Sequence, residues 1–98
     1  MKITEHAQRR MRERTGIGKG SVDRIAQKAL DEGLHHSETT GNLNKWITSL
    51  YFRYQTANNI RLYGDKAYMF NGETLITILQ IPASLMKNIG KDKARKEQ

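Results

Sequence analysis

Two short turn signals in the second half of the chain, Gly64-Asp65 and Asn71-Gly72, constrain the fold more than any other feature. Each pair favours a two-residue hairpin turn, and runs of aromatic and β-branched residues flank both of them. Pro82 ends the segment, because proline has no N–H for strand pairing. The pattern predicts a meander of three antiparallel strands, over about residues 59–63, 66–70 and 73–80.

Helical signals fill the first half of the chain. Thr4 is a candidate N-cap for a helix over residues 5–14, a segment without glycine, proline or β-branched residues. Ser21 is the expected N-cap of an amphipathic second helix, which Gly33 should end in a left-handed conformation. A broad apolar stripe then predicts a third helix over about residues 42–55, although several of its residues would also fit a strand.

The length of the chain, 98 residues, leaves room for one hydrophobic core, so we expect one domain. The order of the elements predicts an α+β domain, in which N-terminal helices pack on one face of a three-stranded, or slightly larger, antiparallel β-meander. This domain should span residues 1–86. A short helical turn is expected at about residues 83–89, and residues 87–98 should form a basic, flexible tail.

Alternation along the strands predicts a sheet with two different faces. One face is almost wholly apolar and should cover the helices, whereas the other mixes cations, phenols and hydrophobic side chains. On the mixed face, Arg61 should lie opposite Tyr68, and Lys66 opposite Thr77. Such a patch would hold phosphate and stack unpaired bases. The alternative is an ordinary solvent-facing side, partly covered by the tail or the first helix. Three residues of this face, if exposed, would make a homodimer reasonable: Phe70, Leu75 and Leu79.

The net charge of +7 is concentrated at the two ends of the chain. Residues 1–28 carry eight Lys and Arg against three acids, and residues 87–98 carry five against two, whereas the middle is nearly neutral. Basic segments beside a folded body favour a polyanionic partner, above all RNA or another nucleic acid. The plainer alternative is that these cations only solubilise exposed helix faces. The candidates for nucleic-acid contacts are Arg9, Arg12, Arg14, Lys19, Tyr63 and Lys66.

Composition and spacing disfavour several other classes of protein. No apolar run approaches the roughly 20 residues of a membrane span, and the N-terminus lacks the apolar core of a signal peptide, so we expect a cytoplasmic protein without a membrane partner. The lack of cysteine excludes disulfides, thiolate zinc sites and cysteine nucleophiles. Adjacent His35 and His36 should point apart, and no ligand spacing supports a metal site, so no metal or other cofactor is expected.

The order of these parts resembles a known ribonuclease superfamily. The segment ITEHAQRRMRER, a second capped helix and the closing meander are similar to small phage and mobile-element proteins related to the RelE-like superfamily, which includes RelE, barnase and colicin D nuclease domains. The resemblance covers roughly residues 1–82. Its motifs are the spaced residues His6, Ala7, Arg10 and Arg14 of the first helix and the strand segment Leu75-Ile76-Thr77-Ile78.

This resemblance implies metal-independent RNA cleavage, in which the ribose 2′-OH attacks the adjacent phosphate and a cyclic phosphate is left. His6 would act as acid or base, and Arg10 and Arg61 would be electrostatic clamps. Tyr68 or Thr77 would orient the phosphate. The chain lacks the dense Arg, Lys and His cluster that the better-known toxins carry at the end of the sheet. The alternative is a non-catalytic accessory protein of the phage type, which binds nucleic acid or a host or cognate protein, such as a host nucleic-acid enzyme that it inhibits.

Overall fold

A mixed sheet lies at the centre of the protein. The computed structural model describes residues 1–16 and 18–96, and the side chain of Lys19 lies outside the described part. The sheet order is β1-β4-β3-β2; β2, β3 and β4 form the antiparallel meander that the turns predict, and β1 adds to it in parallel with β4. The bounds of the strands are Lys2–Ile3 (β1), Asn59–Tyr63 (β2), Lys66–Asn71 (β3) and Thr74–Gln80 (β4).

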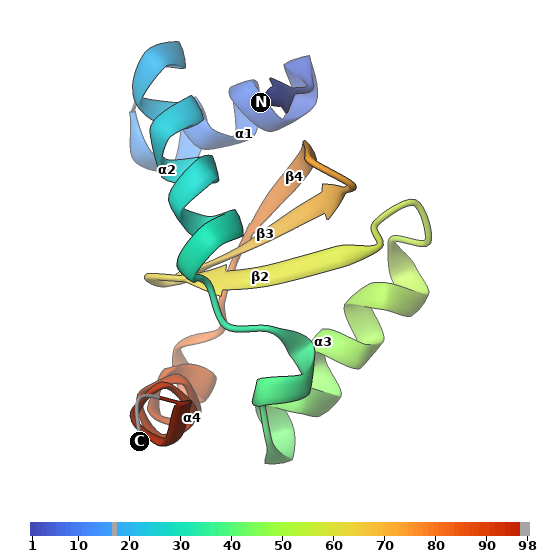
Figure 1. Ribbon diagram of the computed structural model, residues 1–98, viewed down its shortest axis with the longest axis vertical. Helices are drawn as coiled ribbons and strands as arrows, with labels where there is room; N and C mark the ends of the chain where they lie inside the picture. Colours follow the sequence, from blue (N-terminus) through green and yellow to red (C-terminus); the bar gives the residue numbers. More distant parts are fainter. Residues whose placement is uncertain (17, 97–98) are drawn as a thin grey trace.

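Along the described part of the chain, three α-helices lie between β1 and β2, and a fourth follows β4 (Figure 1). The α+β class predicted from the sequence is therefore confirmed. Among the described residues, no helix has the length and apolar character needed to cross a membrane. The bounds are Glu5–Thr15 (α1), Lys19–Glu32 (α2), Gly41–Arg53 (α3) and Met86–Lys96 (α4), with short 3-10 helices at His36–Glu38 (η1) and Ala83–Leu85 (η2).

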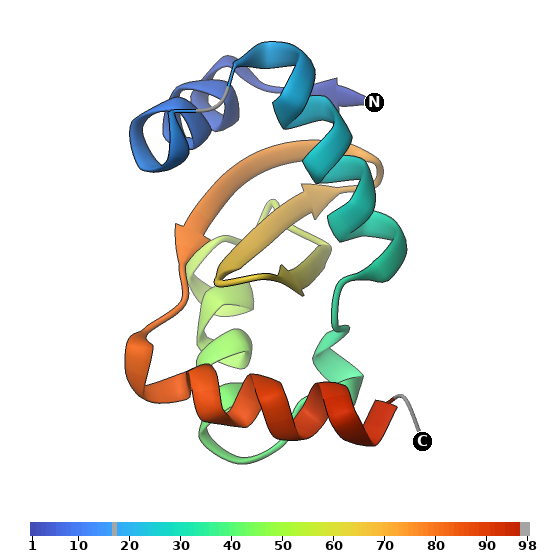
Figure 2. The same ribbon diagram turned by 90° about the vertical axis from the view of Figure 1, so that its left-hand side faces the viewer.

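The helices cover both faces of the sheet. Side chains that alternate along β3 enter different hydrophobic clusters: Tyr68 and Phe70 pack with α1 and α2, whereas Ala67 and Met69 pack with α3. Because successive side chains of a strand point to opposite faces, α1 and α2 lie on one face and α3 on the other (Figure 1; Figure 2). The expectation that the helices pack on one face is wrong. The mixed face carries enough apolar surface to require its own cover.

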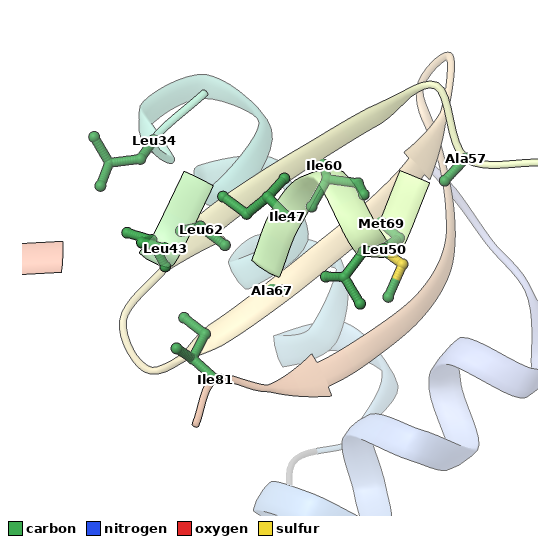
Figure 3. Close-up of a cluster of buried hydrophobic side chains, with 10 residues drawn as sticks. All are labelled: Leu34, Leu43, Ile47, Leu50, Ala57, Ile60, Leu62, Ala67, Met69 and Ile81. Atoms are coloured by element: carbon green, nitrogen blue, oxygen red, sulfur yellow. The ribbon is translucent and has the colours of Figure 1, made fainter. Parts of the chain in front are cut away.

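The core beneath α3 shows why this helix lies where it does (Figure 3). Leu43, Ile47 and Leu50 of α3 are at most 3% exposed and follow the spacing of one helical face. They pack in one cluster with Ile60 and Leu62 of β2. The other buried members of the cluster are Leu34, Ala57, Ala67, Met69 and Ile81.

The first hairpin has the expected register, and the second does not. Arg61 lies opposite Tyr68, as predicted. Lys66, however, lies opposite Gln80 instead of Thr77. The predicted cross-strand group of cations, phenols and a threonine therefore does not form as expected.

Two features of the second hairpin cause this difference. The two residues between the paired Asn71 and Thr74 make the turn, one position later than expected, and Gly72 supplies its positive φ of 60°. The register then shifts again between Met69 and Phe70, a β-bulge. As a result Ile78, expected on the apolar face, belongs to the cluster under α1 and α2.

The ends of the first two helices are set by different devices. The side chain of Thr4 accepts a hydrogen bond from the backbone N–H of Ala7 at 3.1 Å, so the predicted N-cap of α1 is confirmed. α2 begins at Lys19 with Gly18 as its N-cap, so the predicted cap at Ser21 is wrong.

Gly33 ends α2 through close packing, not through a left-handed backbone. Its φ is −64°, which any residue adopts. A Cβ at this position would lie 2.5 Å from the carbonyl oxygen of Ala29 and 3.0 Å from Cβ of Arg61. The chain therefore needs glycine here, because the backbone of α2 at Ala29 and the neighbouring strand β2 at Arg61 leave no room for a Cβ.

We expect Gly33→Ala to lower the free energy of unfolding by about 1–3 kcal/mol, the usual cost of forcing atoms into a packed site. Gly20→Ala is the matched control, because Gly20 lies within α2 and a Cβ added there would have no described atom within 4 Å outside its own helix turn. That change should raise stability by roughly 0.5–1 kcal/mol, because alanine is the better helix former. Urea unfolding of both variants measures the difference. Equal effects of the two changes would contradict the close packing around Gly33.

Residues 87–96, expected as part of a flexible tail, belong to the helix α4, which packs on the domain, and residues 97–98 of that tail lie outside the described residues. Asp92 is 3% exposed, and its carboxylate accepts hydrogen bonds from the backbone N–H of Thr40 at 3.0 Å and from its hydroxyl at 2.8 Å. Thr40 is the N-cap of α3, so Asp92 satisfies a donor at the positive end of that helix. Lys96 also pairs with Glu38 of η1 at 3.4 Å. The folded domain thus extends through α4.

Candidate nucleic-acid interface

Arg61, the predicted phosphate clamp, lies beneath the end of α2 and is only 5% exposed. Its Nη1 donates to the carbonyl oxygen of Leu30 at 2.5 Å, and its Nε and Nη2 donate to that of Gly33 at 3.1 and 2.7 Å. Burial lowers the pKa of the guanidinium, yet arginine keeps its charge in proteins. The side chain therefore caps the C-terminus of α2, where the helix dipole is negative.

Three more residues predicted for the mixed face are also buried. Tyr68 is 4% exposed, and burial raises the pKa of its phenol to about 12, so the group stays protonated at neutral pH. The ammonium group of Lys66 donates to Asp65 at 3.0 Å and to Gln80 at 3.2 Å. Thr77 is buried as well. The expectation of an open ligand-binding sheet face is wrong, because α1 and α2 cover it and its cations have partners within the fold.

The three hydrophobic residues whose expected exposure suggested a homodimer are also covered by helices. Phe70 and Leu75 are fully buried under α1 and α2, and Leu79 is partly buried against the core under α3. The sequence-based argument for a dimer through this face therefore no longer holds.

The predicted catalytic residues do not meet in one pocket. His6 is exposed in the first turn of α1 and Arg10 is half-buried one turn later, whereas Arg61, Tyr68 and Thr77 are buried in the fold. None of the five lines any of the five pockets that the structure describes. In the described part of the chain, no group of three or more His, Asp or Glu side chains could hold a metal ion.

The outer side of α1 carries the candidate interface. Only Ala7 and Met11 of this helix are buried, against the sheet, and Arg9, Arg12 and Arg14 are exposed. None of the ion pairs in the described part of the chain involves an arginine of α1. Arg12 and Arg14 lie in the last turn, where the helix dipole favours cations. Arg9 and Arg12 lie on the outer side of α1, whereas Arg14 follows Ala7 and Met11 along the helix and is exposed at its end. All three can therefore meet an external anion.

Sequence reasoning missed two further cations, which α2 adds to this interface. Arg24 and Lys28 are exposed and lie one turn apart, on the side of α2 away from its buried residues. Since α1 and α2 cover the same sheet face, their outer sides point away from the same core (Figure 1). The signal for both residues was their i, i+4 spacing opposite the apolar stripe. We call this set the α1/α2 surface: Arg9, Arg12, Arg14, Arg24 and Lys28.

Of the two other predicted contact residues, one does not join this surface and the other is not described. The side chain of Lys19 lies outside the described part of the chain. Tyr63 is half-buried and lines a cavity of about 300 Å³ together with Glu32 and Leu34 and with two lysines of α4. It therefore lies beside α4, away from the outer side of α1.

The two adjacent histidines have separate surroundings. His35 is exposed, and partial desolvation together with the nearby charge of Arg61 lowers the pKa of its ring. Its backbone N–H donates to the carboxylate of Glu38 at 2.8 Å, and this bond is the main cause of the lowered pKa of Glu38. His36 turns towards α3, where its Nε2 lies 2.8 Å from the hydroxyl oxygen of Thr48. The two rings thus serve different parts of the structure.

Comparisons with known proteins return no match. The chain matches no protein-family model, no curated protein and no solved structure. Its function is therefore inferred from the placement of its own charged and aromatic side chains.

Proposed function

We propose that the protein binds nucleic acid through the α1/α2 surface and does not cleave it. The observation that carries this proposal is the contrast between two groups of cations. Arg61 and Lys66 are buried and hydrogen-bonded within the fold, whereas the arginines of α1 are exposed or half-buried and take part in none of the described ion pairs. The arginines of α1 are accessible to the phosphate groups of a nucleic acid, which can neutralise their charge.

The helical geometry supports contacts to the phosphate backbone more than contacts to base edges. The cations of the α1/α2 surface come from two helices that both pack on the same face of the sheet, so they spread over a surface instead of projecting from one helix into a groove. Contacts to phosphate position a protein on nucleic acid but carry little sequence information. We therefore expect binding with weak sequence preference and strong dependence on salt.

Ribonuclease activity, which the RelE-like resemblance implies, is the second candidate. It is favoured by one observation: His6 and Arg10 are four residues apart on α1, so a potential acid or base and a cation share one side of that helix. The non-catalytic function is preferred because the other predicted catalytic groups have structural partners or are buried. Arg61 caps α2, and Tyr68 lies within the core.

One experiment separates the two functions. Purified protein is incubated with total RNA in EDTA, and its affinity for a short duplex is measured by fluorescence anisotropy between about 50 and 200 mM salt, over which phosphate contacts lose much of their affinity. We expect no cleavage, and a slope of log affinity against log salt of about −4.5 if five phosphates are neutralised.

Two results would contradict the proposal. Cleavage that persists in EDTA and disappears in His6→Ala would establish the ribonuclease. Binding that does not weaken with salt would show that phosphate contacts are not its basis.

A further inference from the structure

Phe52, near the end of α3, is the most exposed large hydrophobic side chain in the described part of the chain. It is 74% exposed, and Met1, the next such residue, is 39% exposed. The remaining large apolar side chains of α3 pack on the sheet, so Phe52 has no part in the core. Single exposed apolar side chains are common on protein surfaces, so the surroundings of Phe52 decide whether it marks a contact surface.

Phe52 borders a groove that is built largely from rings. The groove holds about 350 Å³ and is lined by Phe52 and Tyr51 together with His36 and Thr48. The ring centroids of His36 and Tyr51 are 5.4 Å apart, and Nε2 of His36 lies 2.8 Å from the hydroxyl oxygen of Thr48. The hydroxyl of Tyr51 accepts the backbone N–H of Ile60, which fixes this ring against the strand. The groove is therefore held in shape by the fold.

The charge of α3, which supplies three of the four residues that line the groove, selects the kind of ring that would enter it. This helix contains no acidic residue, and its two cations, Lys45 and Arg53, are both exposed. No ion pair in the described part of the chain involves Lys45 or Arg53. A planar aromatic ligand that carries negative charge fits such a surface, and an unpaired nucleotide has both properties.

We propose that this groove binds an unpaired base of a single-stranded nucleic acid, with Phe52 stacking on the base and Lys45 and Arg53 attracting the adjoining phosphates. Aromatic platforms flanked by cations bind single strands in this way, because every base has a flat face whatever its sequence. The proposal rests on the proposed function. It adds a preference for unpaired strands to the salt-dependent binding at the α1/α2 surface. The two contact surfaces lie on opposite faces of the sheet.

The test compares a single-stranded homopolymer with a blunt duplex of equal length, both fluorescently labelled. Phe52→Ala should lower the affinity for the single strand by about 5-fold or more, the lower end of the range for base stacking, and leave the affinity for the duplex unchanged. Phe52→Leu keeps an apolar side chain without a ring and should lose the same affinity. Phe52→Trp should keep it, and its fluorescence should be quenched by the single strand beyond the change seen for Trp46 in the wild type. Because Phe52 is exposed, all three variants should unfold in urea like the wild type.

Three outcomes would overturn this inference: single-strand affinity in Phe52→Leu equal to that of the wild type, an equal loss for duplex and single strand, or a dimer in sedimentation that disappears in Phe52→Ala. The proposed function fails on different evidence, namely a duplex affinity that is independent of salt and of the arginines of α1. Single-strand binding that needs Phe52 but not these arginines would support binding at the groove and contradict binding at the α1/α2 surface.

Discussion

Arg61→Ala should lower the free energy of unfolding by about 3–5 kcal/mol, a large share of the roughly 5–15 kcal/mol that holds a domain of this size together. The change leaves the carbonyl oxygens of Leu30 and Gly33 without their donors at the end of α2. The N–H of Leu34, which would continue the helix, donates instead to Leu62 in β2, so Leu30 has no other partner on the helix. Each buried acceptor left unsatisfied costs about 1–3 kcal/mol, and the lost side chain leaves a cavity.

Urea unfolding of Arg61→Ala and of Arg24→Ala measures this effect. Arg24 is an exposed arginine on the same helix, and its replacement should change stability by no more than about 0.5 kcal/mol. Under conditions where both variants are folded, Arg61→Ala should bind nucleic acid as the wild type does. If the two replacements had equal effects on stability and Arg61→Ala alone lost binding, Arg61 would be a ligand contact and its role as the cap of α2 would be wrong.

Charge reversal on α1, in the double variant Arg9→Glu and Arg12→Glu, should have the largest effect on binding. Each phosphate contact that is lost reduces the salt slope by about 1, so the slope for duplex DNA should become shallower by about 2. Affinity at physiological salt should fall by at least about tenfold, because two attractive contacts become repulsive. Both side chains are exposed and form none of the described ion pairs, so we expect the variant to fold. Its free energy of unfolding should fall by about 1 kcal/mol, because Arg12→Glu places an acid in the last turn of α1.

The matched control is Lys87→Glu and Lys91→Glu, an equal change of charge on exposed residues of α4. α4 lies at the opposite end of the molecule from α1 (Figure 2). At physiological salt, charges act over about 8 Å, so this control should weaken binding much less. Equal losses in the two double variants would show that net charge alone attracts nucleic acid and that α1 is not a defined interface.

Part of the proposed interface was visible in the sequence. Arg9, Arg12 and Arg14 were predicted contacts because a run of arginines on a short helix with a narrow apolar stripe has little core to enter. Phe52 was not singled out, although the helical pattern contains a signal for it. It lies nine residues after Leu43, on the opposite side of α3 from the apolar stripe.

The sequence by itself determined the features that depend on neighbours along the chain. The turn glycines fixed β2 and its pairing with β3, and the short hydroxyl side chain of Thr4 fixed the start of α1, because both effects act within a few residues. Only the tertiary structure decided what covers the sheet. The bulge near Phe70 and the docking of α4 through Asp92 both depend on contacts between distant segments. The packing of β2 against the end of α2 is a contact of the same kind. It buries Arg61, which the sequence suggested as a ligand residue, and the guanidinium therefore caps α2, because a buried cation needs partners within the fold.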